Sequence, residues 1–510
     1  METIYAAAPE ILELIDAGRT DEAIERILAF KQSGTGTRYT LIRVLISTGQ
    51  HRDDARLTRC ALDAFERIKA KAPNDPEMFY DIANGYQVLV ESALHTAPGA
   101  GFDCEEEIKQ AIRYFGKAGD HDPRAVTNLG NLYDTIGRPV EAIACYERAL
   151  AVDPGFAMAA GNKAMALEVL APISSYSTTY QIHAHQLYEA ALGNEASLLE
   201  VGGEPALVHF RQRNEAIERR FTESGHAELL GQDLSHEPYD DGSLSEFVRF
   251  YVETCVRHDL YLNLHIVDRR AQASIGDRIA PVLHTGPAES DDQQYVQDIM
   301  FRLNEIIESY MTARLLFVRS QFTDDDSSAI SEQTTLVNLL DYSVSNIYVG
   351  QLKASYKEAF SALDKVAVLI NHYLGIGHSE SSVYYGNVWY EPASLDTTDE
   401  PVLADAVRAG GYRLLGLYLL CRELSGSKYS HLRNALTHRY ARVYRVVPGP
   451  KGTQTFEEMS SLTADLLYKI KCAIMYAALS IEHQERQKYP PSAAPTIQMP
   501  LYTDQNLDLW

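Results

Sequence analysis

Three polar residues near the C-terminal end of the chain have the types and spacing for chemistry on a phosphate. Asn434 and His438 are four residues apart, so on a helix they share one face, and Arg433 lies about 100° around the axis from Asn434. An imidazole exchanges protons near neutral pH, and a guanidinium fork suits a phosphate. In principle these groups can cleave RNA without a metal ion.

The imidazole would accept or donate the proton of the ribose 2′-hydroxyl or of the leaving 5′-oxygen, and the arginine would stabilise the charged phosphorane. The same spacing also fits a salt-bridged or capped surface helix.

The charge around these residues favours contact with a nucleic acid. No Asp or Glu occurs between Glu423 and Glu457. The basic residues of this interval are Lys428, Arg433, Arg439, Arg442, Arg445 and Lys451, and its tyrosines are Tyr429, Tyr440 and Tyr444. Residues 340–489 contain 16 Lys+Arg and 15 Asp+Glu, whereas the whole chain carries a net charge of -24. We expect the RNA contacts to be local and to come from Arg439, Arg442, Tyr444 and Arg445. The alternative is a solvated basic helix that binds no RNA.

Long helices are expected to position these groups. Leu432, Leu436, Val443 and Val447 predict one helix over 430–447, with one flank in a core and an end at Pro448-Gly449. Further helices are expected to open at Tyr310–Arg319 and to span Ile347–Tyr373, Gly411–Leu424 and Phe456–Gln487. The C-terminal third is therefore predicted to be a helical bundle.

The N-terminal third contains a repeat. The pattern Ala-x3-aromatic-x2-Ala-x4-Pro runs from Ala111 to Pro123 and again, 31 residues later, from Ala142 to Pro154. Asn128–Tyr133 supplies the first helix of a helix pair. This pattern resembles the tetratricopeptide repeat, in which small residues let paired helices approach closely. The resemblance implies a solenoid whose concave surface binds a peptide or protein.

The C-terminal motif also resembles a known family. Arg433 and His438 form Arg-x4-His with Asn434 after the arginine, within a late helix of an all-α bundle. Together with Asp364-Lys365, Ile370–Tyr373 and the helix containing Ala313-Arg314, this resembles the HEPN (higher eukaryote and prokaryote nucleotide-binding) superfamily, in the subgroup fused to tetratricopeptide repeats.

That resemblance implies a metal-independent endoribonuclease that is generally dimeric, with two Arg/His sets meeting at the dimer interface. It implies that Arg433 stabilises the phosphate and the transition state, that His438 is the catalytic imidazole, and that Asn434 positions the substrate or a partner helix. The implied products are a 2′,3′-cyclic phosphate and a 5′-hydroxyl.

Composition and motif spacing exclude several other classes. The six cysteines are scattered without a CxxC, which indicates reduced thiols. No apolar run is long enough for a membrane span, and no signal peptide is evident, so we expect a cytoplasmic protein without membrane contact. His183 and His185 form H-x-H, but we identify no third ligand at metal-binding spacing. We therefore expect neither a metal nor a cofactor.

The sequence thus predicts an all-α chain with four parts: a tetratricopeptide-like solenoid at 1–170, a mainly helical connecting region at 171–305, a HEPN-like bundle at 306–490 and an extended tail at 491–510. The leading hypothesis is an endoribonuclease controlled by the repeat domain, in a toxin-like or anti-phage role. The alternative is a non-catalytic adaptor whose HEPN-like module dimerises or binds a nucleotide. A peptide-sensing regulator is a third possibility, although no DNA-binding helix-turn-helix is evident.

Overall fold

The computed structural model describes residues 4–30, 38–72, 74–97, 99–234, 239, 242–264, 274–279, 290–337, 339–397, 400–445 and 454–488. Across these residues almost all of the regular secondary structure is helical, so the prediction of an all-α fold is confirmed. The chain forms two compact units. The first comprises Met1–Val169, Gln181–Gln232 and Val407–Gly416, and the second comprises Leu170–Tyr180, Asp233–Ala406 and Leu417–Trp510. The predicted limits at 170, 305 and 490 stay predictions, and the tail at 491–510 lies outside the described residues.

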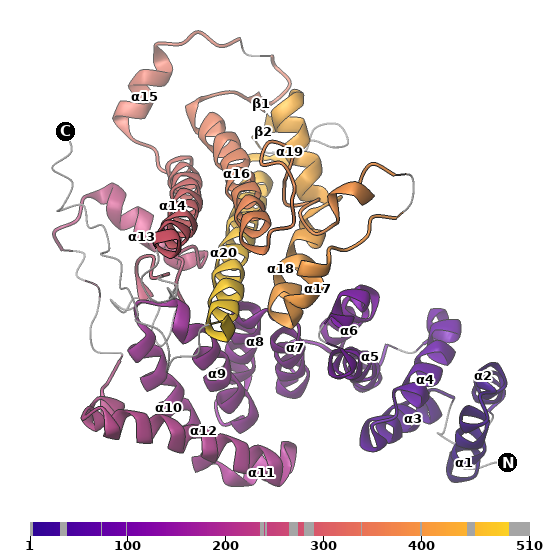
Figure 1. Cartoon of the computed structure of the whole chain (residues 1–510). Helices are drawn as coiled ribbons and strands as arrows, with labels where there is room; N and C mark the ends of the chain where they lie inside the picture. The colour runs from indigo at the N-terminus through magenta and orange to yellow at the C-terminus, as the bar shows by residue number, and fades with distance from the viewer. Residues whose placement is uncertain are drawn as a thin grey trace. The chain divides into compact units, whose positions relative to one another are not determined.

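The first unit is a series of antiparallel helical hairpins. Its helices are α1 (Ile4–Asp16), α2 (Thr20–Ala29), α3 (Arg38–Arg52), α4 (Ala55–Ile68), α5 (Pro76–Thr96), α6 (Glu105–Ala118), α7 (Pro123–Thr135), α8 (Pro139–Val152), α9 (Ala157–Leu170), α10 (Ser177–Gly193), α11 (Glu195–Val201), α12 (Gly203–Glu223) and α17 (Asp405–Ala409). Its short 3-10 turns are Lys69–Lys71, Ala100–Asp103 and Ala227–Gly231, whereas Ala171–Ile173 and Pro392–Ser394 are 3-10 turns of the second unit. Helices α3 and α4, α5 and α6, and α7 and α8 pack as pairs (Figure 1). The predicted hairpin solenoid is therefore present.

Local sequence sets where these hairpins begin and end. Asp75 and Asp122 cap α5 and α7 by accepting backbone N–H bonds, and Pro76 and Pro123 occupy the first helical position, where no intrahelical N–H bond is lost. Pro123 therefore opens α7. The preceding helix α6 ends at Gly119, whose φ of +102° lies in the range that glycine tolerates.

Two glycines explain the close packing of α7 and α8. A Cβ at Gly130 would lie 2.5 Å from the Tyr146 ring, so only glycine lets this ring approach α7. Gly137 joins the two helices with a φ of +78°, and a Cβ there would lie 2.2 Å from the carbonyl oxygen of Tyr412. Both the backbone angle and the space therefore require glycine at position 137.

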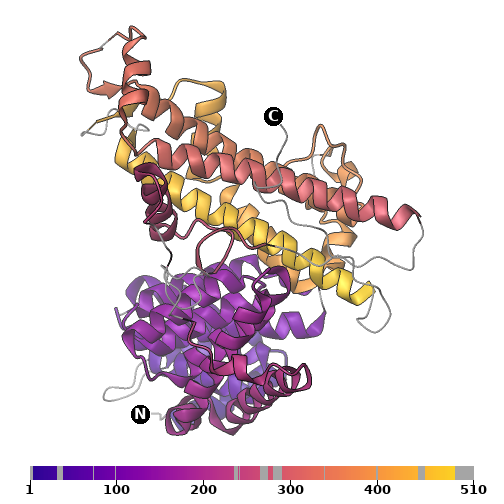
Figure 2. The same cartoon turned by 90° about the vertical axis from the view of Figure 1, so that its left-hand side faces the viewer.

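The second unit is a bundle of long helices. Its helices are α13 (Glu246–Arg257), α14 (Ser290–Arg319), the short α15 (Asp325–Glu332), α16 (Ile347–Leu374), α18 (Gly411–Leu424, whose first residues belong to the first unit), α19 (Lys428–His438) and α20 (Phe456–Lys488). Helix α16 contacts α14, α19 and α20. In Figure 2 the red α14 and the yellow α20 run side by side, and they also contact each other. The predicted helices at 347–373, 411–424 and 456–487 are confirmed to within one residue at each end.

The predicted helix over 430–447 is wrong in its second half. Helix α19 ends at His438, and Val443–Tyr444 forms strand β2. This strand pairs antiparallel with β1 (Ser343–Val344) and parallel with β3 (Gln454–Thr455). β-branched and aromatic residues favour such pairing over a helix. Val443 is buried at 2% exposure, but in a strand, whereas Val447 and Pro448-Gly449 lie outside the described residues.

In the described part of the chain, no helix is both long and apolar enough to cross a membrane.

Candidate functional site

Arg433 is held against helix α16 by a carboxylate and two aromatic rings. Its Nη2 donates to Oδ2 of Asp364 at 2.7 Å. The guanidinium carbon lies 5.5 Å from the ring centroid of Phe360 and 5.9 Å from that of Tyr385. Phe360 and Asp364 are one helical turn apart, so α16 offers a ring and an acceptor on one face.

Asp364 is itself fixed within the second unit. Its Oδ1 accepts the backbone N–H of Tyr385 at 3.2 Å, while Oδ2 accepts from Arg433. Burial raises the pKa of Asp364, and the charge of Arg433 and the Tyr385 N–H partly oppose this rise. From the sequence, Asp364 belongs only to the family resemblance, which predicts no role for it. Nothing in the local sequence signals its pairing across 69 residues.

Arg433 keeps donors for a ligand. Its side chain is 31% exposed, and among the described residues only Nη2 has a hydrogen-bond partner. A guanidinium carries five N–H groups in a fixed fork. Nε and Nη1 can therefore bind a phosphate while Asp364 holds the group in place.

Asn434 and His438 lie on the solvent side of α19. Both are exposed, and neither side chain has a hydrogen-bond or ion-pair partner among the described residues. His438 is the last residue of the helix. Five residues on a helix correspond to about 140° of rotation and about 7.5 Å of rise, so Arg433 and His438 point in different directions. Within one α19, Asn434 and His438 therefore lie on the same face of the helix, and Arg433 lies on a different face.

The residues expected to contact RNA divide into exposed and covered groups. Arg439 and Arg445 are exposed, and Arg442 is exposed but pairs with Asp341 at 3.0 Å. Tyr444 is only 4% exposed because it belongs to β2, so its ring is not open to a base. This removes Tyr444 from the expected contact surface.

A different tyrosine occupies the open position. Tyr440 is fully exposed, in the stretch between α19 and β2. Lys353 of α16 donates to the carbonyl oxygen of Ala441 at 2.6 Å and holds this stretch to the bundle. Tyr440 lies among the basic residues of the sequence. A continuous helix over 430–447 would not indicate that Tyr440, and not Tyr444, contacts RNA.

The first unit contains a cavity of about 320 Å³ along its inner helices α3, α5 and α7. Asparagines line it: Asn128 Nδ2 donates to Oδ1 of Asn84 at 2.9 Å and to the hydroxyl of Tyr80 at 3.1 Å. Asn131 and Arg124 also face the cavity. An amide row of this kind offers donors and acceptors to a peptide backbone.

One cluster was overlooked in the sequence. His185 lies with Glu189 and Glu218, and the ligand atoms of the three are within 4.8 Å of one another. Glu189 follows His185 by one helical turn, a spacing that the sequence analysis does not select, and His183 is not part of the cluster. The other histidine, His183, is buried away from solvent, and neither of its ring nitrogens has a hydrogen-bond partner in the described part of the chain.

Comparison with known proteins identifies two sequence families. Residues 290–484 match the LA2681-like HEPN family, and residues 123–156 match the tetratricopeptide repeat family. No curated protein matches the chain. Among solved structures, the thermophilic tetratricopeptide protein TTC0263 of Thermus thermophilus is 18% identical, with a TM-score of 0.26, and the match covers 42% of this chain and 98% of that one. MamA is also 18% identical, with a TM-score of 0.24 and coverage of 37% and 95%. The sequence matches show that this chain carries an LA2681-like HEPN domain together with a tetratricopeptide repeat.

Proposed function

We propose that the chain is a metal-independent endoribonuclease and that α19 supplies its catalytic groups. The observation that carries the proposal is the anchoring of Arg433. Asp364 holds one end of the guanidinium, the side chain is partly exposed with no further hydrogen-bond partner among the described residues, and His438 is exposed on the same helix. This arrangement lies within the residues that match the HEPN family.

The reaction is an internal transesterification. The ribose 2′-oxygen forms a bond to phosphorus, the bond from phosphorus to the 5′-oxygen breaks, and the 2′-hydroxyl proton is transferred in net terms to the leaving oxygen. His438 moves this proton, and Arg433 stabilises the charge on the phosphorane. The products are a 2′,3′-cyclic phosphate and a 5′-hydroxyl. Arg439, Arg442 and Arg445 would hold neighbouring phosphates, and Tyr440 would stack on a base.

The active form would be a homodimer. Arg433 and His438 point in different directions on one α19, so a phosphate that needs both groups is better served by Arg433 of one copy and His438 of another. Asn434, exposed beside His438, would contact the substrate or the second copy of α19.

The repeat unit would control this activity. The asparagine-lined cavity of about 320 Å³ suits an extended segment of a protein or peptide, and binding there would act as the signal. A toxin-like or anti-phage role fits an RNA-cleaving enzyme that a sensor regulates.

The test is cleavage of a single-stranded and a structured RNA by the purified full-length protein in EDTA. We expect wild-type cleavage that yields cyclic phosphate ends, and none when a 2′-deoxynucleotide stands at the cleavage position. Arg433→Ala should lower the rate by about 10²–10³-fold and His438→Ala by about 10²–10⁴-fold. His431→Ala is the matched control, since His431 is an exposed histidine on the same helix, and it should retain activity.

Equal cleavage by wild type and both variants would identify a contaminating nuclease and reject the proposal. An inert wild-type protein that stays inert with cavity ligands, yet forms a dimer, would favour the adaptor function instead.

A further inference from the structure

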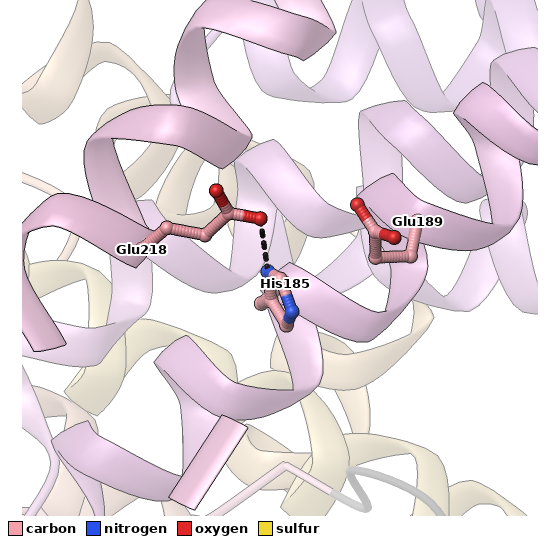
Figure 3. Close-up of side chains that lie close together, drawn as sticks. All are labelled: His185, Glu189 and Glu218. Carbon is pink, nitrogen blue, oxygen red and sulfur yellow. Dashed lines mark ion pairs between the residues drawn. The ribbon is translucent and has the colours of Figure 1, made fainter. Parts of the chain in front are cut away.

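A mixed nitrogen and oxygen donor set occurs in the first unit, outside the proposed ribonuclease site. His185 and Glu189 lie one turn apart on α10, and Glu218 faces them from α12 (Figure 3). The imidazole Nδ1 is 4.0 Å from Oε1 of Glu218, and the His185 side chain is only 13% exposed. Three side chains from two helices thus direct ligand atoms to one small region.

The buried side-chain amide of Asn214 contacts all three of these side chains. Asn214 is 3% exposed, its Nδ2 donates to Oε1 of Glu189 at 2.5 Å and to Oε1 of Glu218 at 3.4 Å, and its Oδ1 lies 2.7 Å from Nδ1 of His185. Carboxylates only accept hydrogen bonds, so the amide NH2 faces the glutamates and its Oδ1 accepts from Nδ1–H of His185. This leaves Nε2 as the imidazole nitrogen that can bind a metal. Metal sites use such outer partners to orient their ligands.

In the described part of the chain, the two carboxylates lack a cationic partner: neither Glu189 nor Glu218 pairs with a lysine or arginine. Arg213 on α12 pairs with Glu168 at 3.0 Å, and Arg220 donates to Gln181 at 2.7 Å. Two carboxylates this close repel each other, and a divalent ion between them would remove the repulsion.

The donor types select the class of ion. Imidazole together with carboxylate suits zinc and related transition metals, whereas calcium and magnesium prefer oxygen ligands alone. Ligand atoms of a tetrahedral zinc site lie about 3.3 Å apart, so Glu189 and Glu218, which are both partly exposed, must move inward by about 1 Å. We propose that His185, Glu189 and Glu218 form a transition-metal site that ties α10 to α12, with water as the fourth ligand.

The test measures zinc bound to the full-length protein. Protein stripped with EDTA is dialysed against zinc chloride, and zinc per chain is measured by mass spectrometry. We expect about one zinc ion per wild-type chain, and its loss in His185→Ala and Glu218→Gln. His209→Ala and Glu215→Gln are matched controls from exposed positions of α12 and should keep the ion. The six cysteines are buried, so they do not supply a competing site.

Two further readouts remain informative if a variant folds poorly. Cobalt(II) should give visible absorption bands of tetrahedral coordination with wild type and Glu215→Gln, but not with Glu218→Gln. Zinc should raise the thermal unfolding midpoint of wild type and leave that of Glu218→Gln unchanged.

Equal zinc content in wild type and His185→Ala, or no retained zinc in either, would reject the metal site and identify the three side chains as a hydrogen-bonded cluster. Binding of magnesium or calcium but not of zinc, in parallel dialyses against each chloride, would reject the assignment to a transition metal. These outcomes do not depend on RNA cleavage in EDTA.

Discussion

Arg433 illustrates how one residue divides its hydrogen bonds between the fold and a ligand. Asp364 accepts a hydrogen bond from Nη2, and the rings of Phe360 and Tyr385 pack on the guanidinium. The N–H groups of Nε and Nη1 have no hydrogen-bond partner among the described residues. A preorganised cation of this kind stabilises charge as it develops without first having to be ordered. In the proposed reaction Asp364 would be a positioning residue that acts through its hydrogen bond to Arg433.

Replacing Asp364 by asparagine should separate positioning from folding. The amide can still accept the Tyr385 N–H, but it no longer holds the guanidinium by charge. We expect kcat for RNA cleavage to fall by about tenfold with a smaller change in KM. The thermal midpoint should stay within a few degrees, because removing a buried charge offsets the lost ion pair. Glu358→Gln, six residues earlier on α16, is the control and should have wild-type kinetics. Equal loss of kcat in both variants, or a large fall in stability of Asp364→Asn, would show that Asp364 has a general structural role.

At the level of elements, the α7–α8 hairpin depends on the backbone at Gly137. A methyl group there must meet the Tyr412 carbonyl oxygen in a conformation that favours glycine. Gly137→Ala should therefore lower the free energy of unfolding by about 1–3 kcal/mol. The contrast is Gly116→Ala within α6, where a Cβ meets no atom within 4 Å and the added helix propensity should stabilise by about 0.5–1 kcal/mol. Denaturant unfolding of both variants measures the difference, and similar changes in both would contradict the role of Gly137.

The same hairpin contains a carboxyl group whose ionisation opposes folding. Asp134 accepts a hydrogen bond from the Tyr146 hydroxyl at 3.0 Å, and burial raises the pKa of Asp134 to about 7, against the opposing effects of this bond and of Arg413. Between about pH 4 and 7 the folded chain keeps a proton that the unfolded chain has lost, so stability falls as pH rises through this window.

Asp134→Asn should remove this pH dependence, because asparagine accepts the Tyr146 hydrogen bond but does not titrate. We expect a thermal midpoint similar to wild type at about pH 4, and an advantage over wild type that grows as pH rises and reaches several degrees at pH 8. Asp120→Asn is the control, since that side chain is 75% exposed, and its midpoint should follow wild type at both pH values. If the thermal midpoints of wild type and Asp134→Asn vary with pH in parallel, ionisation of Asp134 does not cause the pH dependence of stability.

Sequence periodicity predicted most elements well and failed where tertiary pairing decided the structure. Helix α16 was predicted almost to the residue because its apolar stripe runs unbroken and ends at Gly375, which adopts a φ of +64°. The stretch after His438 has both helical and strand-like spacing, and its choice of strand depends on β1, about 100 residues earlier. That partner is not visible in the local sequence, so helical spacing wrongly predicts an exposed Tyr444 and does not single out Tyr440. The pairing of Arg433 with Asp364 and the convergence of His185, Glu189 and Glu218 likewise depend on contacts between distant segments.

For the whole molecule, the proposed dimer makes a quantitative prediction. We consider a mixed dimer with Arg433→Ala in one subunit and His438→Ala in the other. If each site takes Arg433 from one subunit and His438 from the other, one of the two sites is intact. The mixed dimer should then retain about half of the wild-type rate, while each homodimeric variant is inactive. Tandem affinity tags isolate the mixed species. A mixed dimer as inactive as the two homodimers would show that each site lies within one subunit.

If α19 supplies the proposed ribonuclease site, its end at His438 also limits how much of an RNA that site can read. Only four residues separate His438 from β2, and an extended chain of that length spans at most about 14 Å. An RNA held along this segment meets the protein over a few nucleotides, with arginines that recognise the backbone more than the bases. Such a short footprint holds little sequence information. Selectivity in a cell would therefore come from when and where the enzyme is switched on.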